Sequence, residues 1–149
     1  MCLPAPASGW PTSRPVMEVV SRWLGGYRCK VSVRDHTIVA DEPESVGGTN
    51  AGPTPTELLL GSLATCFTMA LSYAARKKDV SFGDDLEVRV EGTYDGPRFS
   101  GIAVQVVAAT APDRATLEEL IPVAADVCYV SNTIRESAEL TYEVTGPQE

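Results

Sequence analysis

The sequence holds a single histidine, His36, and none of its four cysteines lies in a CxxC pair. Structural zinc sites usually take four Cys or His ligands in close spacing, so Cys2, Cys29, Cys66 and Cys128 predict no zinc site. His36 falls at the tip of an expected hairpin, and we interpret it as a solvated turn residue and not as a catalyst. The cysteines are then either buried small hydrophobes or redox-active thiols.

Positive charge is also scarce, with 12 Lys and Arg against 20 Asp and Glu, a formal net charge of −8. Such a chain repels nucleic acid phosphates and anionic membrane surfaces. Its longest basic run, Arg76-Lys77-Lys78, falls at the end of an expected helix, where cations suit the helix dipole. The composition therefore excludes nucleic acid and membranes as expected partners.

No run approaches the ~20 consecutive apolar residues that cross a bilayer, and residues 58–75 are interrupted by Gly, Ser and Thr. The first sixteen residues hold prolines at positions 4, 6, 11 and 15 and no continuous apolar core, so we expect no signal peptide. We predict a disordered tail over residues 1–16, a single domain over residues 17–149 and a cytoplasmic location. Either Met1 or Met17 is a candidate start.

Alternation of apolar and polar residues predicts a first strand from Tyr27 to Arg34 and a second from Thr37 to Asp41. Cys29 then belongs to the apolar face. Residues 42–52 are expected to form a loop with Gly47-Gly48 at its centre.

The segment Thr54-Pro55-Thr56-Glu57 has a helix-capping Thr, proline at the first helical position and Glu three residues after the cap. It predicts a capping box and a helix from Pro55 to about Lys77. Apolar residues surround this helix almost completely, so we expect a central helix covered by sheet or by a partner subunit.

The remaining segments complete the expected fold. Strands are predicted near residues 86–91 and 98–109 around a turn at Asp95-Gly96-Pro97, and a second helix from Pro112-Asp113 to Val127. A short helical or irregular piece over residues 131–136 and a last strand over residues 139–144 follow. The order β-β-α-β-β-α-β is an α+β domain.

Two segments carry the functional signal. Cys66 ends the segment that begins Gly52-Pro53-Thr54-Pro55-Thr56-Glu57-Leu58-Leu59-Leu60, and Cys128 opens Cys128-Tyr129-Val130-Ser131-Asn132. Together with Gly47-Gly48, these two sequence motifs resemble those of the OsmC/Ohr family, the osmotically inducible and organic-hydroperoxide-resistance proteins. The resemblance covers nearly all of residues 27–144. The sequence after Gly52 is similar to that of the broader OsmC-like branch of the family.

The resemblance implies an OsmC-like fold in an intertwined homodimer, a stress-response role and a thiol peroxidase that uses no metal or organic cofactor. Cys66 is implied as the nucleophile that attacks an organic hydroperoxide, and Cys128 as the thiol that resolves the product through a disulfide. A dithiol, such as the lipoyl group of a lipoyl protein, is implied as the reductant.

The resemblance also implies an arginine from the first hairpin beside Cys66. Arg34, before Asp35, matches it best, and Arg28 is the second candidate. The family's Glu directly follows the Pro, whereas here Thr56 follows Pro55 and Glu57 comes one position later. One residue is ~100° of helix rotation, so Glu57 faces elsewhere and also serves the capping box. Glu57 stays a candidate catalytic residue despite its displaced position and its capping function.

A second function remains open from the residues alone. The displaced Glu favours a non-enzymatic OsmC-like dimer that binds a small apolar ligand or senses redox state. The retained pair of cysteines favours the peroxidase. Ser131 and Asn132 are interpreted as capping residues of the following turn and not as substrate contacts.

Overall fold

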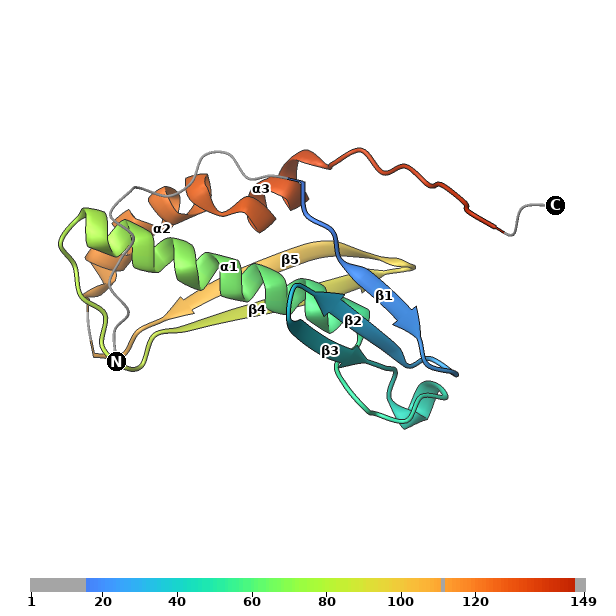
Figure 1. Cartoon of the computed structure of the whole chain (residues 1–149). Helices are drawn as coiled ribbons and strands as arrows, with labels where there is room; N and C mark the ends of the chain where they lie inside the picture. The colour runs from blue at the N-terminus through green and yellow to red at the C-terminus, as the bar shows by residue number, and fades with distance from the viewer. Residues whose placement is uncertain (1–15, 111, 147–149) are drawn as a thin grey trace. The chain divides into compact units, whose positions relative to one another are not determined.

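The computed structural model describes residues 16–110 and 112–146. The predicted tail and Cys2 therefore lie, apart from Val16, outside the described residues. The elements follow the order β1 (Val20–Trp23), β2 (Cys29–Val33), β3 (His36–Ala40), the 3-10 turn η1 (Glu44–Val46), α1 (Pro55–Lys77), β4 (Glu87–Asp95), β5 (Arg98–Val107), α2 (Arg114–Val127) and α3 (Tyr129–Glu136) (Figure 1). The α+β class is confirmed.

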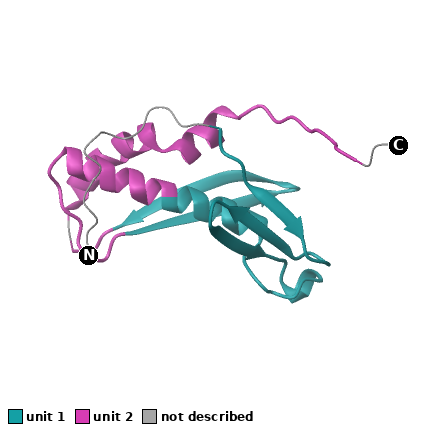
Figure 2. Ribbon diagram, in the orientation of Figure 1, with its two compact units in different colours: residues 1–65, 87–107 teal, residues 66–86, 108–149 magenta. Residues whose placement is uncertain are grey.

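The described chain divides into two compact units, neither of which is continuous in sequence (Figure 2). Unit 1 comprises the residues up to Thr65 together with residues 87–107. Unit 2 comprises residues 66–86 and those from Ala108 onward. Helix α1 contributes its first half to unit 1 and its second half to unit 2.

Unit 1 contains an antiparallel sheet in the order β1-β2-β3. Val33 pairs with His36, so Arg34 and Asp35 form a two-residue hairpin turn in which Arg34 takes a left-handed φ of 50°. Such turns need positive φ, which costs a non-glycine residue some strain. The β2–β3 hairpin agrees with the prediction, but β1 was not expected, because all four of its residues are exposed and show no apolar alternation.

The second sheet of unit 1 pairs β4 with β5, and Gly96-Pro97 links Asp95 to Arg98. Along β4, Val88 and Val90 are half-buried while Glu87 and Arg89 are exposed, as the alternation predicted. The Tyr94 hydroxyl reaches out of this sheet and donates to Thr56 Oγ1 of α1 at 2.8 Å.

The loop between β3 and α1 is organised around Asp41, a carboxylate with only 1% exposure. Its oxygens accept hydrogen bonds from the Thr49 hydroxyl at 2.6 Å and from the N–H groups of Glu42, Thr49 and Ala51 at 2.8, 2.9 and 3.1 Å. These bonds, the Thr49 hydroxyl first, lower the pKa of Asp41 to about 2.

Two glycines allow this loop to lie against the backbone it follows. A Cβ at Gly48 would stand 1.8 Å from the Glu42 carbonyl oxygen, and one at Gly52 would stand 1.9 Å from that of Val39. No side chain fits at either position, which accounts physically for two glycines of the family wording.

Helix α1 begins with the predicted capping box. Thr54 Oγ1 accepts from the Glu57 N–H at 3.2 Å, and Glu57 Oε2 accepts from the Thr54 N–H at 2.8 Å. By length and composition α1 would suit a membrane span. Residues such as Ala70, Leu71 and Ala74 are fully buried, however, as in the core helix of a globular domain.

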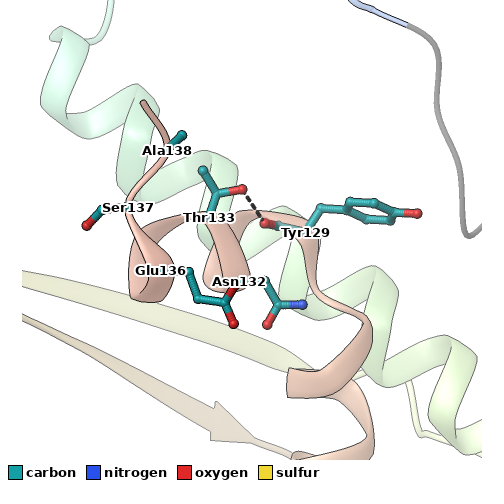
Figure 3. A pocket seen from close by; sticks show the side chains of 6 residues that line it. All are labelled: Tyr129, Asn132, Thr133, Glu136, Ser137 and Ala138. Atoms are coloured by element: carbon teal, nitrogen blue, oxygen red, sulfur yellow. Dashed lines mark hydrogen bonds between the residues drawn. The ribbon is translucent and has the colours of Figure 1, made fainter. Parts of the chain in front are cut away.

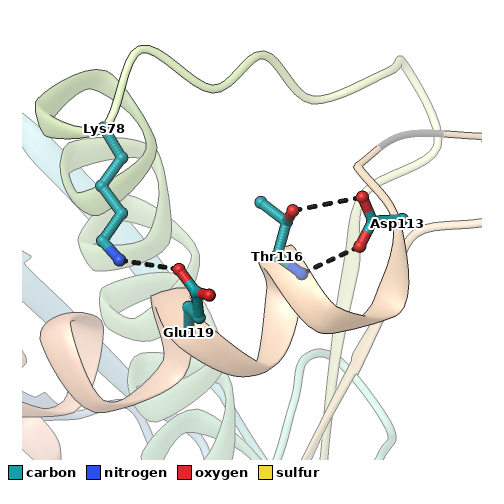
Figure 4. A network of polar contacts seen from close by, with 4 residues as sticks. All are labelled: Lys78, Asp113, Thr116 and Glu119. Atoms are coloured by element: carbon teal, nitrogen blue, oxygen red, sulfur yellow. Dashed lines mark hydrogen bonds and ion pairs between the residues drawn. The ribbon is translucent and has the colours of Figure 1, made fainter.

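Buried residues of unit 2 come from two helices and the joint after the second one. They are Phe67, Ala70, Leu71, Ala74 and Ala75 of α1, Leu120 and Ala124 of α2, and Cys128. Lys78 ties the end of α1 to Glu119 of α2 through an ion pair of 3.1 Å (Figure 4). Asp113 caps α2 by accepting from the Thr116 N–H at 3.0 Å, so this helix begins where the sequence predicted.

The predicted last strand is wrong for this chain: residues 139–144 pair with no other strand in the described part of the molecule. Leu140, Tyr142 and Val144 of this segment are 77%, 88% and 96% exposed. The alternating pattern is present, but a strand also needs a neighbouring edge, which a sequence pattern does not supply.

The buried Asp41 predicts an acid-sensitive loop. Its folded pKa of about 2 lies below the ordinary 3.8, so the folded state binds fewer protons than the unfolded one. The stabilisation is therefore complete above pH 3.8 and disappears as pH falls through about 2. We expect Asp41→Asn to lower the urea midpoint at pH 6 and to flatten its decline between these pH values. Glu44→Gln, at an exposed carboxylate of the same loop, should leave both unchanged; equal curves for wild type and Asp41→Asn would contradict the assignment.

Candidate functional site: a pair of thiols

Cys66 and Cys128 lie together within unit 2. Cys66 sits in the middle of α1 and is half-buried, whereas Cys128 is fully buried where α2 ends and α3 begins. The side chains are close enough to hydrogen-bond, and both are free thiols. Cys66 and Cys128 are 62 positions apart in the sequence, and the turn between α2 and α3 places Cys128 beside α1.

Backbone N–H groups of α3 also reach Cys66. Those of Val130 and Tyr129 donate to the Cys66 sulfur, and both lower the pKa of this thiol. The first N–H groups of a helix have no partner inside it. Cys128 is the N-cap residue of α3, but its side chain makes no capping bond. The sulfur of Cys66 supplies that missing acceptor from another helix.

This arrangement was missed at the sequence level. Cys66 lies in the middle of α1, away from both ends of its own helix dipole. The stabilising end belongs instead to α3, whose first residue is Tyr129. The available signal was the break between α2 and α3 directly at Cys128, which puts a helix N-terminus beside the second cysteine.

Burial nevertheless dominates the acidity of Cys66. Removal of the sulfur from water raises its pKa, the two N–H groups oppose that effect, and the adjacent Cys128 raises it further through its hydrogen bond and its charge. Two neighbouring thiols resist carrying two negative charges. Cys66 is therefore held mainly as a thiol within unit 2, and a cation would be needed to make it a strong nucleophile.

The two candidate arginines belong to unit 1. Arg34 occupies the exposed β2–β3 turn, and Arg28 precedes β2 and is also exposed. The groups that act on Cys66 within its own unit are the Cys128 thiol and backbone N–H groups. The role of either arginine stays a prediction.

Glu57 occupies the capping box in unit 1, where its carboxylate is bound to the Thr54 N–H. Thr56, at the position after Pro55, forms a short hydroxyl chain: its Oγ1 accepts from Tyr94 at 2.8 Å and lies 3.2 Å from Thr54 Oγ1. The capping function of Glu57 is confirmed, whereas its catalytic role stays a prediction.

The side-chain donors of Ser131 and Asn132 bond backward along the chain, and neither side chain caps a backbone group of the following turn. Ser131 Oγ donates to the Cys128 carbonyl at 3.2 Å, and Asn132 Nδ2 donates to the Asp126 carbonyl at 3.1 Å. They act at the α2–α3 joint, beside the thiol pair.

A pocket of about 340 Å³ lies along α3 and the residues after it (Figure 3). It is lined by Tyr129, Asn132, Thr133, Glu136, Ser137 and Ala138. Its lining includes polar side chains from Asn132, Thr133, Glu136 and Ser137. Within the described ranges, no group of three or more His, Cys, Asp and Glu residues could hold a metal ion.

Fold and site together define an α+β protein with two adjacent reduced cysteines at a helix junction. The family model OsmC, described as OsmC-like protein, matches residues 48–143, a range that includes both cysteines. The match covers more than half of the chain, which therefore belongs to the OsmC-like protein family. A search of curated proteins finds no match.

Solved structures share the fold at low sequence identity. The OsmC-like protein from Mycoplasma pneumoniae is 17% identical with a TM-score of 0.70, and the alignment covers 84% of this chain and 91% of that one. An organic hydroperoxide resistance protein from Elizabethkingia anophelis is 21% identical with a TM-score of 0.63, covering 85% and 93%. The organic hydroperoxide resistance protein OsmC from Legionella pneumophila is 23% identical with a TM-score of 0.60, covering 83% and 93%. At these identities the likeness shows the fold.

Proposed function

We propose that the protein is a cysteine-based peroxidase that reduces organic hydroperoxides. The observation that carries this proposal is the contact between the Cys66 and Cys128 thiols, with backbone N–H groups directed at the Cys66 sulfur. Membership of the OsmC-like family and the organic hydroperoxide resistance proteins among its structural neighbours support it.

The proposed cycle has three balanced steps. The Cys66 thiolate attacks the terminal oxygen of ROOH, the O–O bond breaks, and after protonation the products are a Cys66 sulfenic acid and the alcohol ROH. The Cys128 sulfur then displaces the sulfenic hydroxyl, forming the Cys66–Cys128 disulfide and releasing water. A dithiol, of which a lipoyl group is one example, reduces the disulfide back to two thiols and becomes a disulfide itself.

Activation of Cys66 is assigned to Arg34. Burial and the neighbouring thiol raise the Cys66 pKa within unit 2, so a cation is needed, and we take it from unit 1. Arg34 is exposed and stands at a hairpin tip, free to meet a second element or a second subunit. Glu57 is the candidate that orients the guanidinium.

We also propose that the active unit is a homodimer in the cytoplasm. Leu59 and Met69 on α1 are 43% and 56% exposed in the single chain, and Leu140 and Tyr142 extend with no strand partner among the described residues. Apolar surface of this kind favours a covering partner.

A non-enzymatic role as a redox sensor is the second candidate. The raised pKa of Cys66 favours it, because a thiol that stays protonated reacts slowly with peroxide. Both candidates share the thiol pair and differ in turnover.

Turnover decides between the two functions. We expect the protein to consume cumene hydroperoxide continuously with dihydrolipoamide present, and peptide mass spectrometry after mild peroxide to find a Cys66–Cys128 disulfide. Cys29 should remain unmodified. Cys66→Ser should abolish turnover, and Cys128→Ser should leave a sulfenic acid on Cys66. A single round of disulfide formation without turnover would favour the sensor, and an unmodified Cys66 at millimolar peroxide would refute both.

The arginine assignment predicts a change in thiol acidity. Arg34→Ala should raise the Cys66 pKa and slow its alkylation near neutral pH, since only the thiolate reacts. Arg28→Ala, directly before β2, is the matched control and should have little effect. The reverse result would transfer the role to Arg28, and no effect of either would leave Cys66 without an arginine.

Glu57 is tested with the same assay. Glu57→Ala should cost about 1 kcal/mol of stability through the lost cap, whereas Glu57→Gln preserves the capping box. Slower alkylation in Glu57→Gln, at unchanged stability, would support the catalytic role.

The dimer predicts a mass of about twice 15.9 kDa by light scattering at micromolar concentration. Met69→Lys should shift the equilibrium toward monomer, because a charge would be buried at the interface. A clean wild-type monomer would contradict the proposal.

A further inference from the structure

Two side chains of α3, those of Asn132 and Arg135, hydrogen-bond to the last turn of α2 and hold the two helices together; we call this pair of contacts the fastening. Asn132 Nδ2 donates to the Asp126 carbonyl at 3.1 Å, and the Arg135 guanidinium donates to the Ala125 carbonyl at 3.5 Å. Arg135 also donates to Asn132 Oδ1, which links the two side chains. Both carbonyls belong to the last turn of α2, where helical carbonyls lack intrahelical partners and a cation is favoured.

The backbone of Asn132 takes part in the first turn of α3. The first intrahelical bond of α3 runs from the Asn132 N–H to the Cys128 carbonyl at 3.0 Å, so the N–H groups before it have no partner in the helix. Those of Tyr129 and Val130 meet the Cys66 sulfur. The same residue, Asn132, therefore closes the first turn with its backbone and holds that turn to α2 with its side chain.

We propose that Asn132 and Arg135 are positioning residues for Cys66: by fastening α3 to the last turn of α2 they hold the N–H groups of Tyr129 and Val130 against the Cys66 sulfur. Neither side chain touches the sulfur. They act through the backbone of α3, and the inference rests on the proposed role of Cys66 as the nucleophile.

The positioning effect of Asn132 and Arg135 on Cys66 can be separated from the direct effect of nearby charges. Cys128, at the α2–α3 joint, is the titratable group that acts on Cys66, Arg135 is the cation on α3, and Arg34 is the cation assigned from unit 1. Asn132→Ala removes the fastening without changing any of these charges. Arg135→Lys keeps the positive charge but loses the planar fork that reaches two acceptors.

The experiment measures the alkylation rate of Cys66 by iodoacetamide against pH, read from the mass of the Cys66 peptide in the full-length protein. We expect Asn132→Ala and Arg135→Lys to move the midpoint of the profile upward by about half a pH unit, which slows the reaction at pH 7 roughly threefold. The double variant should shift no further than either single one, because both residues serve one joint.

Thr133→Ala is the matched control. Its hydroxyl donates to the Tyr129 carbonyl at 2.8 Å within α3 and makes no contact with α2 among the described hydrogen bonds. This variant should keep the wild-type profile. An equal shift in Thr133→Ala would mean that general loosening of α3, and not the fastening, sets the reactivity, and would overturn the inference.

A wild-type profile in Asn132→Ala, with helical content unchanged by circular dichroism, would also overturn it. If Asn132→Ala does not fold, the profile of Arg135→Lys decides between the same two outcomes. Alkylation needs no peroxide, so a failure of the positioning role can be distinguished from a failure of the proposed peroxidase function. A Cys66 that alkylates with the expected shifts but resists cumene hydroperoxide would end the peroxidase proposal and leave the positioning role supported.

Discussion

The site depends on a hydrogen-bonded contact between the Cys66 sulfur and the start of α3. Here the N–H groups of Tyr129 and Val130 meet an acceptor that α3 does not have within itself, because the side chain of its N-cap residue, Cys128, makes no capping bond. The same contact brings Cys128 beside Cys66. One junction therefore satisfies a helix end, pairs two thiols and opposes part of the burial penalty on a thiolate.

Acidity and burial compete at this junction. A fully exposed Cys66 would ionise more readily but would not be held beside its partner, whereas the partly buried Cys66 is positioned for a disulfide but prefers to stay protonated. The N–H groups reduce this conflict without removing it. That balance explains why an activating cation from outside unit 2 is central to the proposed peroxidase and unnecessary for a sensor that reacts once.

The motif residues divide into those that shape the fold and those that carry chemistry. Gly48 and Gly52 allow close approach of two backbone segments, and Thr54 with Glu57 begins α1. These contacts give structural reasons for much of the sequence motif that identifies the family. The two cysteines are the part of that motif which the capping box and the close backbone contacts of the glycines do not explain.

The sequence by itself determined the local elements with strong signals. Its capping box placed α1, alternation placed β2 and β4, and Asp113 marked the start of α2, because each depends on neighbours within a few residues. It also determined the family, through two cysteines in recognisable surroundings. It missed β1, whose four exposed residues carry no periodic pattern, and it predicted a final strand that finds no partner edge among the described residues.

Tertiary structure alone decided how Cys66 meets α3. The donors to its sulfur are backbone groups, which every residue possesses, so no side-chain pattern marks them. The fastening by Asn132 and Arg135 likewise depends on where the last carbonyls of α2 point after the break at Cys128. The unpaired backbone groups at helix ends and strand edges find their partners among the segments that the fold brings near them, and a thiol pair forms in the same way. Packing sets this proximity between distant segments, and local sequence does not.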